Sequence, residues 1–156
     1  IAIDVVPNLD HVNGIYLCNF LLHINGKSLG QLEQQSSLGV LINGFEKGLA
    51  RASLINIKHF EILSDEQILS TLNDDDLDYY LLRLSLGDDF DDFSMMLYYK
   101  TAEIIRILWQ LSDSPFFDYT SYEKGLIYSA ELNLSDVVSC LEATKYWLKQ
   151  QYIFNL

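Results

Sequence analysis

Eight aspartates gather in one short stretch of this chain, and carboxylates at such density can hold divalent cations or bind a basic partner. They are Asp74, Asp75, Asp76, Asp78, Asp88, Asp89, Asp91 and Asp92. With Arg83 as the only base among them, the 19 residues from Asp74 to Asp92 carry a net charge of −7. The rest of the chain carries −5 of the total of −12, so the acidity is concentrated.

Two metal-binding patterns fit these aspartates only in part. Alternate aspartates in 74–78 have the spacing of an EF-hand, but Tyr79 stands where that loop needs glycine and Ser85 where it needs a bidentate glutamate. Residues 88–92 have the DDxxD spacing that holds magnesium in prenyl-diphosphate enzymes, but they lack the neighbouring bases that a diphosphate requires. We therefore expect no metal site and no cofactor.

Other catalytic patterns also fail. The run 26–28 (Gly-Lys-Ser) resembles the end of a P-loop, but Leu21 stands where the first glycine belongs. The three histidines have no zinc-binding spacing, and no GxSxG nucleophile elbow occurs. Cys140 falls inside a predicted helix, away from an activating N-terminus. The sequence therefore predicts a protein that is not an enzyme.

Composition excludes several further classes. Apolar residues make up 49% of the 156 residues, which is too many for a disordered chain. No run of 18 apolar residues predicts a membrane helix, and residues 1–10 have no basic leader, so we expect a cytoplasmic protein. The negative charge disfavours binding to nucleic acid and favours a basic partner.

The elements that must position the carboxylates begin with a hairpin over 15–32, which turns at Asn25-Gly26. Spacing predicts a helix over 36–52, in which three glycines permit close packing. We expect a strand over 54–62 and a short helix through Leu72, opened by a capping box from Ser64 to Gln67. Residues 79–86 are predicted as a strand with a shared apolar face: Tyr80, Leu82, Leu84 and Leu86.

Residues 93–111 fit either a helix or a two-stranded hairpin, and their isoleucines and aromatics favour the hairpin. Another strand is expected over 125–132. Ser135 is predicted to cap a final helix whose inner stripe begins with Val137, Val138 and Leu141. This order predicts an α+β fold: one domain over 1–156, with a mostly antiparallel sheet packed by two or three helices.

All eight aspartates are expected to stay solvated in turns at the two ends of strand 79–86. We predict that they bind a partner, with Phe90 adding apolar contact area. The main hypothesis is electrostatic capture of a basic protein. Two alternatives stay open: an acidic nucleic-acid mimic that regulates a DNA-binding protein, and a metal-dependent enzyme that uses the aspartate clusters.

Three parts of the sequence resemble immunity proteins of bacterial contact-dependent growth inhibition systems: the hairpin 20–27, the stretch from 91–93 to 107–111, and 128–132 before the final helix. The resemblance implies a small acidic α+β protein in the cytoplasm. It also implies a partner, the toxic C-terminal domain of a delivered effector. Many such domains are nucleases with basic clefts, which an acidic immunity protein can block.

Overall fold

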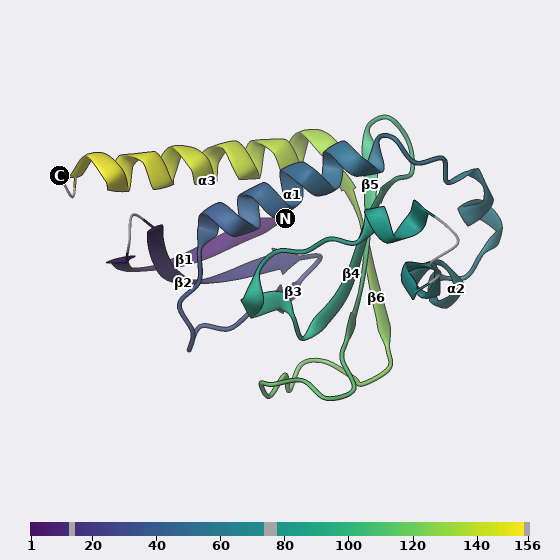
Figure 1. Cartoon of the computed structure of the whole chain (residues 1–156), viewed down its shortest axis with the longest axis horizontal. Coiled ribbons are helices and arrows are strands. Elements are labelled where there is room, and N and C mark those ends of the chain that lie inside the picture. Colours follow the sequence, from purple (N-terminus) through teal and green to yellow (C-terminus); the bar gives the residue numbers. More distant parts are fainter. Residues whose placement is uncertain (13–14, 74–77, 155–156) are drawn as a thin grey trace.

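The computed structural model describes residues 1–12, 15–73 and 78–154. Its described strands form two separate three-stranded antiparallel sheets, accompanied by three α-helices (Figure 1). The expected α+β class is therefore confirmed, although the strands divide between two sheets.

The first sheet has the order β1-β2-β3 and lies at the N-terminal end of the chain. The hairpin of β2 (Ile15–Ile24) and β3 (Lys27–Leu29) is confirmed. Asn25 and Gly26 both have positive φ, +48° and +76°, as a type I′ turn requires. The sequence reasoning missed β1 (Ala2–Val12), although alternate residues of its first half are exposed, as in a half-buried strand.

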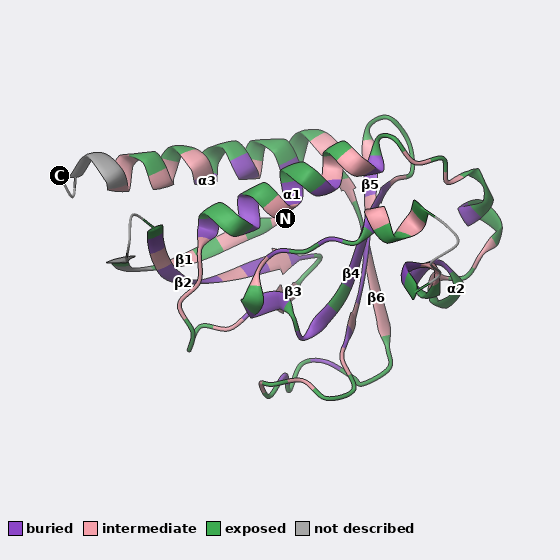
Figure 2. Ribbon diagram, viewed as in Figure 1, coloured by how far each residue is buried: buried purple, intermediate pink, exposed green. Residues whose placement is uncertain are grey.

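Helix α1 (Leu38–Ala52) confirms the helix predicted over 36–52. Its buried face includes Leu38, Leu41 and Phe45, and the helix contacts β2, β4 and α3 (Figure 2). Helix α1 therefore joins the two sheets through one hydrophobic core.

The strand predicted over 54–62 is wrong. Residues Lys58–Ile62 form the 3-10 helix η1, and the Asn56 side chain accepts a hydrogen bond from the Lys58 backbone N–H. Only Phe60 of η1 is buried, so the apolar residues there do not form a strand face. The next prediction is confirmed: α2 (Asp65–Ser70) begins with a complete capping box between Ser64 and Gln67, and η2 (Thr71–Asn73) continues it.

The strand predicted over 79–86 is also wrong. It is replaced by the 3-10 helix η3 (Asp78–Leu82) and an extended segment, 83–86, which has a single bridge from Arg83 to Met96. The alternating leucines of this segment are buried, but Tyr80 is 52% exposed. Burial against α1 and β4 imposes the same alternation as a strand, so the pattern alone was misleading.

The second sheet has the order β4-β5-β6. Strands β4 (Phe93–Tyr99) and β5 (Ile104–Leu111) form the favoured hairpin, which decides between the two readings of 93–111. Strand β6 (Ile127–Asn133) confirms the last predicted strand. Central residues of this sheet, among them Leu97 and Ile107, are completely buried.

Helix α3 (Leu134–Phe154) follows β6 directly and runs beside α1 (Figure 1). Because the helix begins at Leu134, Ser135 lies in its first turn and is not its cap. Val137 and Leu141 face the core as predicted, but Val138 is exposed. None of the helices among the described residues has the length and hydrophobicity that crossing a membrane requires.

Candidate functional site

The predicted partner-binding residues have different surroundings in the structure. Asp74, Asp75 and Asp76 lie outside the described residues. Asp78, at the start of η3, is exposed. The other five lie in or beside the 3-10 helix η4 (Asp88–Phe90), in the segment 88–92 that we call the acidic turn.

Only two of these five side chains face solvent. Asp88 and Asp91 are exposed, whereas Asp89, Phe90 and Asp92 are 1%, 3% and 4% exposed. The expectation that every carboxylate of the two clusters is solvated is therefore wrong for Asp89 and Asp92. Alternation within one tight turn sends some of its side chains inward, which charge counting does not detect.

Phe90 attaches the acidic turn to the first sheet. Its ring lies 6.1 Å from that of Phe20, a completely buried residue of β2. The prediction placed Phe90 at the surface as a contact residue. Its burial in the core instead gives it a role in holding Asp88 and Asp91 in place.

Asp92 attaches the acidic turn to the loop between β5 and β6, which we call loop 112–126. Its carboxylate accepts hydrogen bonds from the backbone N–H groups of Phe116 (2.8 Å) and Phe117 (3.2 Å). Its carbonyl accepts a third from Ser112 (2.8 Å). Hydrogen bonds to a carboxylate offset much of the cost of burying it. Asp92 therefore fixes the start of this loop beside the acidic turn.

Asp89 lacks this compensation. Among the described residues, neither of its carboxylate oxygens has a hydrogen bond of normal geometry. Burial raises the pKa of Asp89 from 3.8 to about 6; the nearby Ser36 hydroxyl partly opposes this rise, and the charge of Asp88 adds to it. Burial, together with the charge of Asp89, also raises the pKa of the Cys18 thiol to about 11. Cys18 is therefore an unreactive thiol at neutral pH.

Loop 112–126 presents an exposed aromatic residue that the sequence reasoning missed. Phe116 is 88% exposed, next to the exposed Asp118 and near Asp113. A phenylalanine in a stretch rich in Ser, Asp and Pro was a signal available in the sequence. We define the acidic face as Phe116 together with the exposed acidic residues of the turn and this loop: Asp88, Asp91, Asp113, Asp118 and Glu123.

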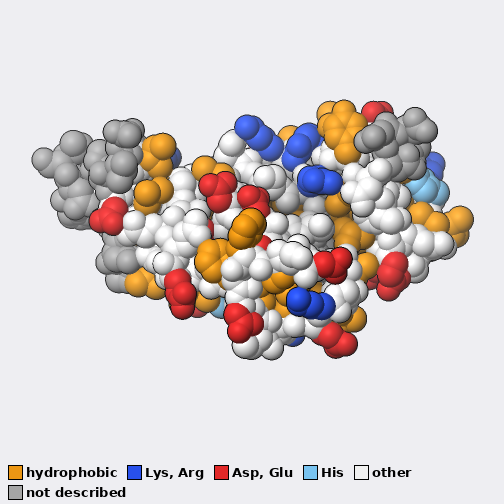
Figure 3. All heavy atoms as spheres, turned by 60° about the horizontal axis from the view of Figure 1, so that its bottom comes forward, with side chains coloured by type: hydrophobic (Ala, Val, Ile, Leu, Met, Phe, Trp, Pro, Cys, Tyr) orange, Lys and Arg blue, Asp and Glu red, His pale blue; other side chains and the backbone are white. Residues whose placement is uncertain are grey.

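An aromatic cluster packs against loop 112–126. The ring of Phe93 lies 4.9 Å from Tyr119 and 5.1 Å from Tyr122. Lys27 of the β2–β3 hairpin donates a hydrogen bond to the Ser121 carbonyl (3.0 Å), and its ammonium lies 5.5 Å from the centre of the Tyr122 ring. The loop is thereby packed on both sheets. Figure 3 shows acidic side chains spread around a hydrophobic centre on the side that carries this loop.

A hollow of about 460 Å³ adjoins Asp88. It lies between the start of β2, the start of α1 and Leu148 of α3, and Asp88 is the only charged residue among the described residues that line it. Ile15 and Val40 on its rim are about half exposed. The acidic turn thus has an apolar recess on one side and loop 112–126 on the other.

Of the first predicted cluster the structure describes only Asp78, and Asp78 and the acidic turn belong to different elements. Segment 83–87 runs between η3, which begins with Asp78, and the acidic turn (Figure 1). A nucleic-acid mimic needs carboxylates spaced along one exposed face, so the burial of Asp89 and Asp92 counts against that alternative. In the described parts of the chain, no group of three or more His, Cys, Asp and Glu side chains is arranged to hold a metal ion.

A compact α+β body with an exposed carboxylate and phenylalanine surface is suited to binding another protein. Comparison with known families agrees with this class. Residues 1–147 match the family described as immunity protein 42. The match covers most of the chain, which therefore belongs to the immunity protein 42 family, a family of bacterial toxin-immunity proteins. No curated protein and no solved structure matches the chain.

Membership of this family has a direct functional meaning. An immunity protein neutralises a cognate toxin, and such proteins are generally inhibitors without enzymatic activity. The expected class of protein and the expected kind of partner are therefore confirmed at this level.

Proposed function

We propose that this protein binds a basic toxin domain through the acidic face and so protects the cytoplasm of the cell that makes it. The observation that carries the proposal is the attachment of Phe116 to the acidic turn by Asp92, which places an exposed aromatic side chain among exposed carboxylates. Aromatic anchors ringed by polar groups are typical centres of protein interfaces.

Charge and size support this assignment. Five carboxylates are exposed in the turn and the loop: Asp88, Asp91, Asp113, Asp118 and Glu123. Lys124 is the one base of the loop, and it donates a hydrogen bond to the Asp113 carbonyl. Such a field steers a basic partner and can raise its association rate to ~10⁸–10⁹ M⁻¹s⁻¹ at low salt. A standard interface of about 800 Å² per partner would use roughly a tenth of the exposed 8907 Å².

The nature of the toxin follows from the same chemistry. A nuclease binds phosphates with lysines and arginines, so an anionic surface complements its active-site cleft. We propose a nuclease domain at the C-terminus of a toxin delivered by contact-dependent growth inhibition. The exposed Asp88 and Asp91 would pair with the bases of that domain, and Phe116 would enter an apolar recess beside them. Asp78 and residues 74–76 form a second acidic stretch of the sequence, and we propose that its charge adds long-range attraction.

The test is a charge-reversal pair measured against the purified toxin domain. We expect Asp88→Lys with Asp91→Lys to slow association at least tenfold at low salt and to flatten its salt dependence, because both charges face solvent at the proposed contact. Phe116→Ala should mainly speed dissociation.

Glu103→Lys is the control. Glu103 is exposed in the hairpin turn between β4 and β5, at the opposite end of β4 from Phe93 and the acidic turn. Glu103→Lys changes the charge in the same direction but far from the acidic face. This variant should therefore keep most of the affinity for the toxin domain. Equal affinity and equal salt dependence for the protein, the double variant and the control would exclude the acidic face as the binding site.

A further inference from the structure

A second hollow has the opposite charge to the acidic face. It measures about 460 Å³ and lies between segment 55–61 and the β4–β5 hairpin. Six lining residues are aromatic or cationic: Phe60, Tyr98, Tyr99, Lys58, Lys100 and Arg106. Among the described lining residues Glu61 is the one carboxylate, so the lining has a formal charge of +2 in a chain whose total is −12. Arg106 and Lys100 are paired with Asp65 and Glu131 just outside the lining, which leaves Lys58 as the base without an ion pair among the described residues. We call it the cationic pocket.

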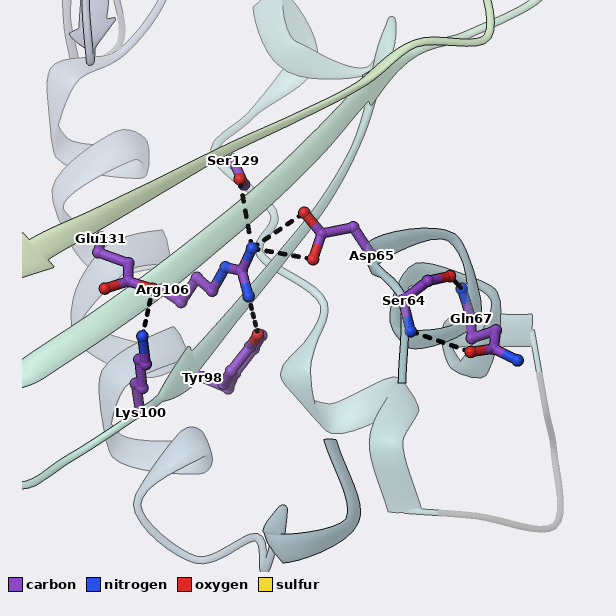
Figure 4. A network of polar contacts seen from close by, with 8 residues as sticks. All are labelled: Ser64, Asp65, Gln67, Tyr98, Lys100, Arg106, Ser129 and Glu131. Atoms are coloured by element: carbon purple, nitrogen blue, oxygen red, sulfur yellow. Dashed lines mark hydrogen bonds and ion pairs between the residues drawn. The ribbon is translucent and has the colours of Figure 1, made fainter. Parts of the chain in front are cut away.

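Arg106 is held firmly at this pocket. Its guanidinium lies 2.9 Å from one carboxylate oxygen of Asp65 and 3.0 Å from the other, and it also contacts Tyr98 and Ser129 (Figure 4). Asp65 is the first residue of α2, whose start is fixed by the Ser64 capping box. Residues of α2, β4 and β6 therefore hold the Arg106 guanidinium in place without a ligand.

Arg106 nevertheless keeps an unused donor. Its Nε–H is buried and has no hydrogen-bond partner among the described residues. This Nε–H is too deeply buried for a ligand in the pocket to reach. The donor that an anion can use is Nη1, whose contact with the Tyr98 hydroxyl is long, at 3.5 Å. Lys58 adds a second available charge, because it is exposed and forms no ion pair within the described residues, whereas Lys100 is bonded to Glu131 at 2.6 Å.

One wall of the pocket is aromatic. Phe60 is 4% exposed, and its ring contacts that of Tyr98 edge to face at 5.3 Å. Tyr99 is partly exposed beside it. Aromatic side chains in this arrangement bind a planar ring. A volume of about 460 Å³ lies within the range of small-molecule sites.

We infer that the cationic pocket binds a small aromatic anion, whose ring packs on Phe60 and Tyr99 and whose carboxylate or phosphate is bound by Lys58 and Arg106. A guanidinium matches the geometry of both anionic groups. The anion is a free small molecule or a group carried by the bound toxin. The inference does not depend on the acidic face.

Phenyl phosphate is the probe, followed by NMR titration of the whole chain. We expect saturable shifts at the Tyr98–Thr101 backbone with a dissociation constant of about 1 mM, and weaker shifts with uncharged phenol. Lys58→Glu should weaken binding at least fivefold. Lys47→Glu makes the same charge change on the exposed side of α1 and should leave binding unchanged.

Other outcomes would overturn the inference: shifts that never saturate, phenol binding as tightly as phenyl phosphate, or equal loss in the two lysine variants. Asp88→Lys with Asp91→Lys should keep phenyl phosphate binding, which separates this test from that of the acidic face. Competition between phenyl phosphate and the toxin domain would indicate a group carried by the toxin. Simultaneous binding would indicate a free small molecule.

Discussion

Asp89 and Asp92 lie three residues apart in the sequence, and both are buried, but the surroundings of their carboxylates differ. Asp92 is buried with two backbone N–H donors, whereas Asp89 is buried without a hydrogen bond of normal geometry among the described residues. The first carboxylate stabilises the loop that it binds. The second opposes folding once it is ionised, because its charge is removed from water without replacement.

Asp89→Asn should stabilise the protein at about pH 7.5, by roughly 1–3 kcal/mol, because it removes a charge whose pKa is raised from 3.8 to about 6 in the fold. The protonated form is favoured in the folded state. The contribution of protonated Asp89 to the free energy of unfolding is therefore complete below pH 3.8, and it is lost as pH rises through about 6. Urea unfolding at several pH values measures the difference.

The gain from Asp89→Asn should shrink as pH falls from about 6 toward 3.8. Asp91→Asn, in the same turn but exposed, should change stability little at any pH. A gain that is independent of pH would contradict the assignment of the effect to the Asp89 charge.

Among the secondary-structure elements, helix α1 and segment 83–86 are packed closely together. A Cβ atom on Gly44 would fall 2.2 Å from the Ser85 carbonyl oxygen, and one on Gly48 would fall 2.9 Å from Leu84. The sequence reasoning correctly attributed close packing to these glycines. It placed this packing on a sheet, whereas Gly44 and Gly48 pack against segment 83–86, which is not a sheet strand.

Gly44→Ala should destabilise the protein by about 3 kcal/mol or more, since backbone must move to admit the methyl group. Gly39→Ala, in the same helix, should be neutral or stabilising by up to about 1 kcal/mol, because its Cβ would meet only the Ser37 hydroxyl at 3.5 Å. Thermal denaturation compares the two variants. Similar stability of both would contradict the close contact between α1 and segment 83–86.

The hairpins, α1 and the capping box of α2 could be predicted because each depends on residues close together in sequence. Two strand predictions failed. At 79–86 the leucines are buried by other elements without a ladder of hydrogen bonds, and at 54–62 the 3-10 helix buries only Phe60 and leaves Leu54 and Ile62 exposed. Strand β1 was missed in the same way, since only its pairing with β2 defines it. In the candidate site, sequence predicted Asp88 and Asp91 but not Phe116.

Across the whole molecule, acidic and basic side chains gather in different places. The acidic turn and loop 112–126 carry exposed carboxylates, while the cationic pocket gathers Lys58, Lys100 and Arg106 near the other end of the β4–β5 hairpin. The net charge of −12 nevertheless leaves repulsion across the surface.

Salt should therefore stabilise this protein. Raising NaCl from about 10 mM to about 150 mM shortens the screening length from roughly 30 Å to roughly 8 Å. We expect a rise in Tm of about 2–4 °C at neutral pH, equivalent to about 1 kcal/mol, in thermal denaturation. The double variant Asp88→Asn, Asp91→Asn should show a smaller rise. A Tm that falls with salt would show that attraction outweighs repulsion.

The sequence by itself determined the α+β class, the antiparallel hairpins, the acidic character and the absence of a complete catalytic motif. These follow from composition and from interactions within a few residues. Tertiary structure alone decided which aspartates are buried, that Phe116 is exposed beside the acidic turn, and that Arg106 is fixed at a cationic pocket. These depend on contacts such as Asp92 with Phe116 and Arg106 with Asp65, 24 and 41 residues apart. The physical reason is that burial and pairing are set by residues distant in sequence, which local periodicity does not record.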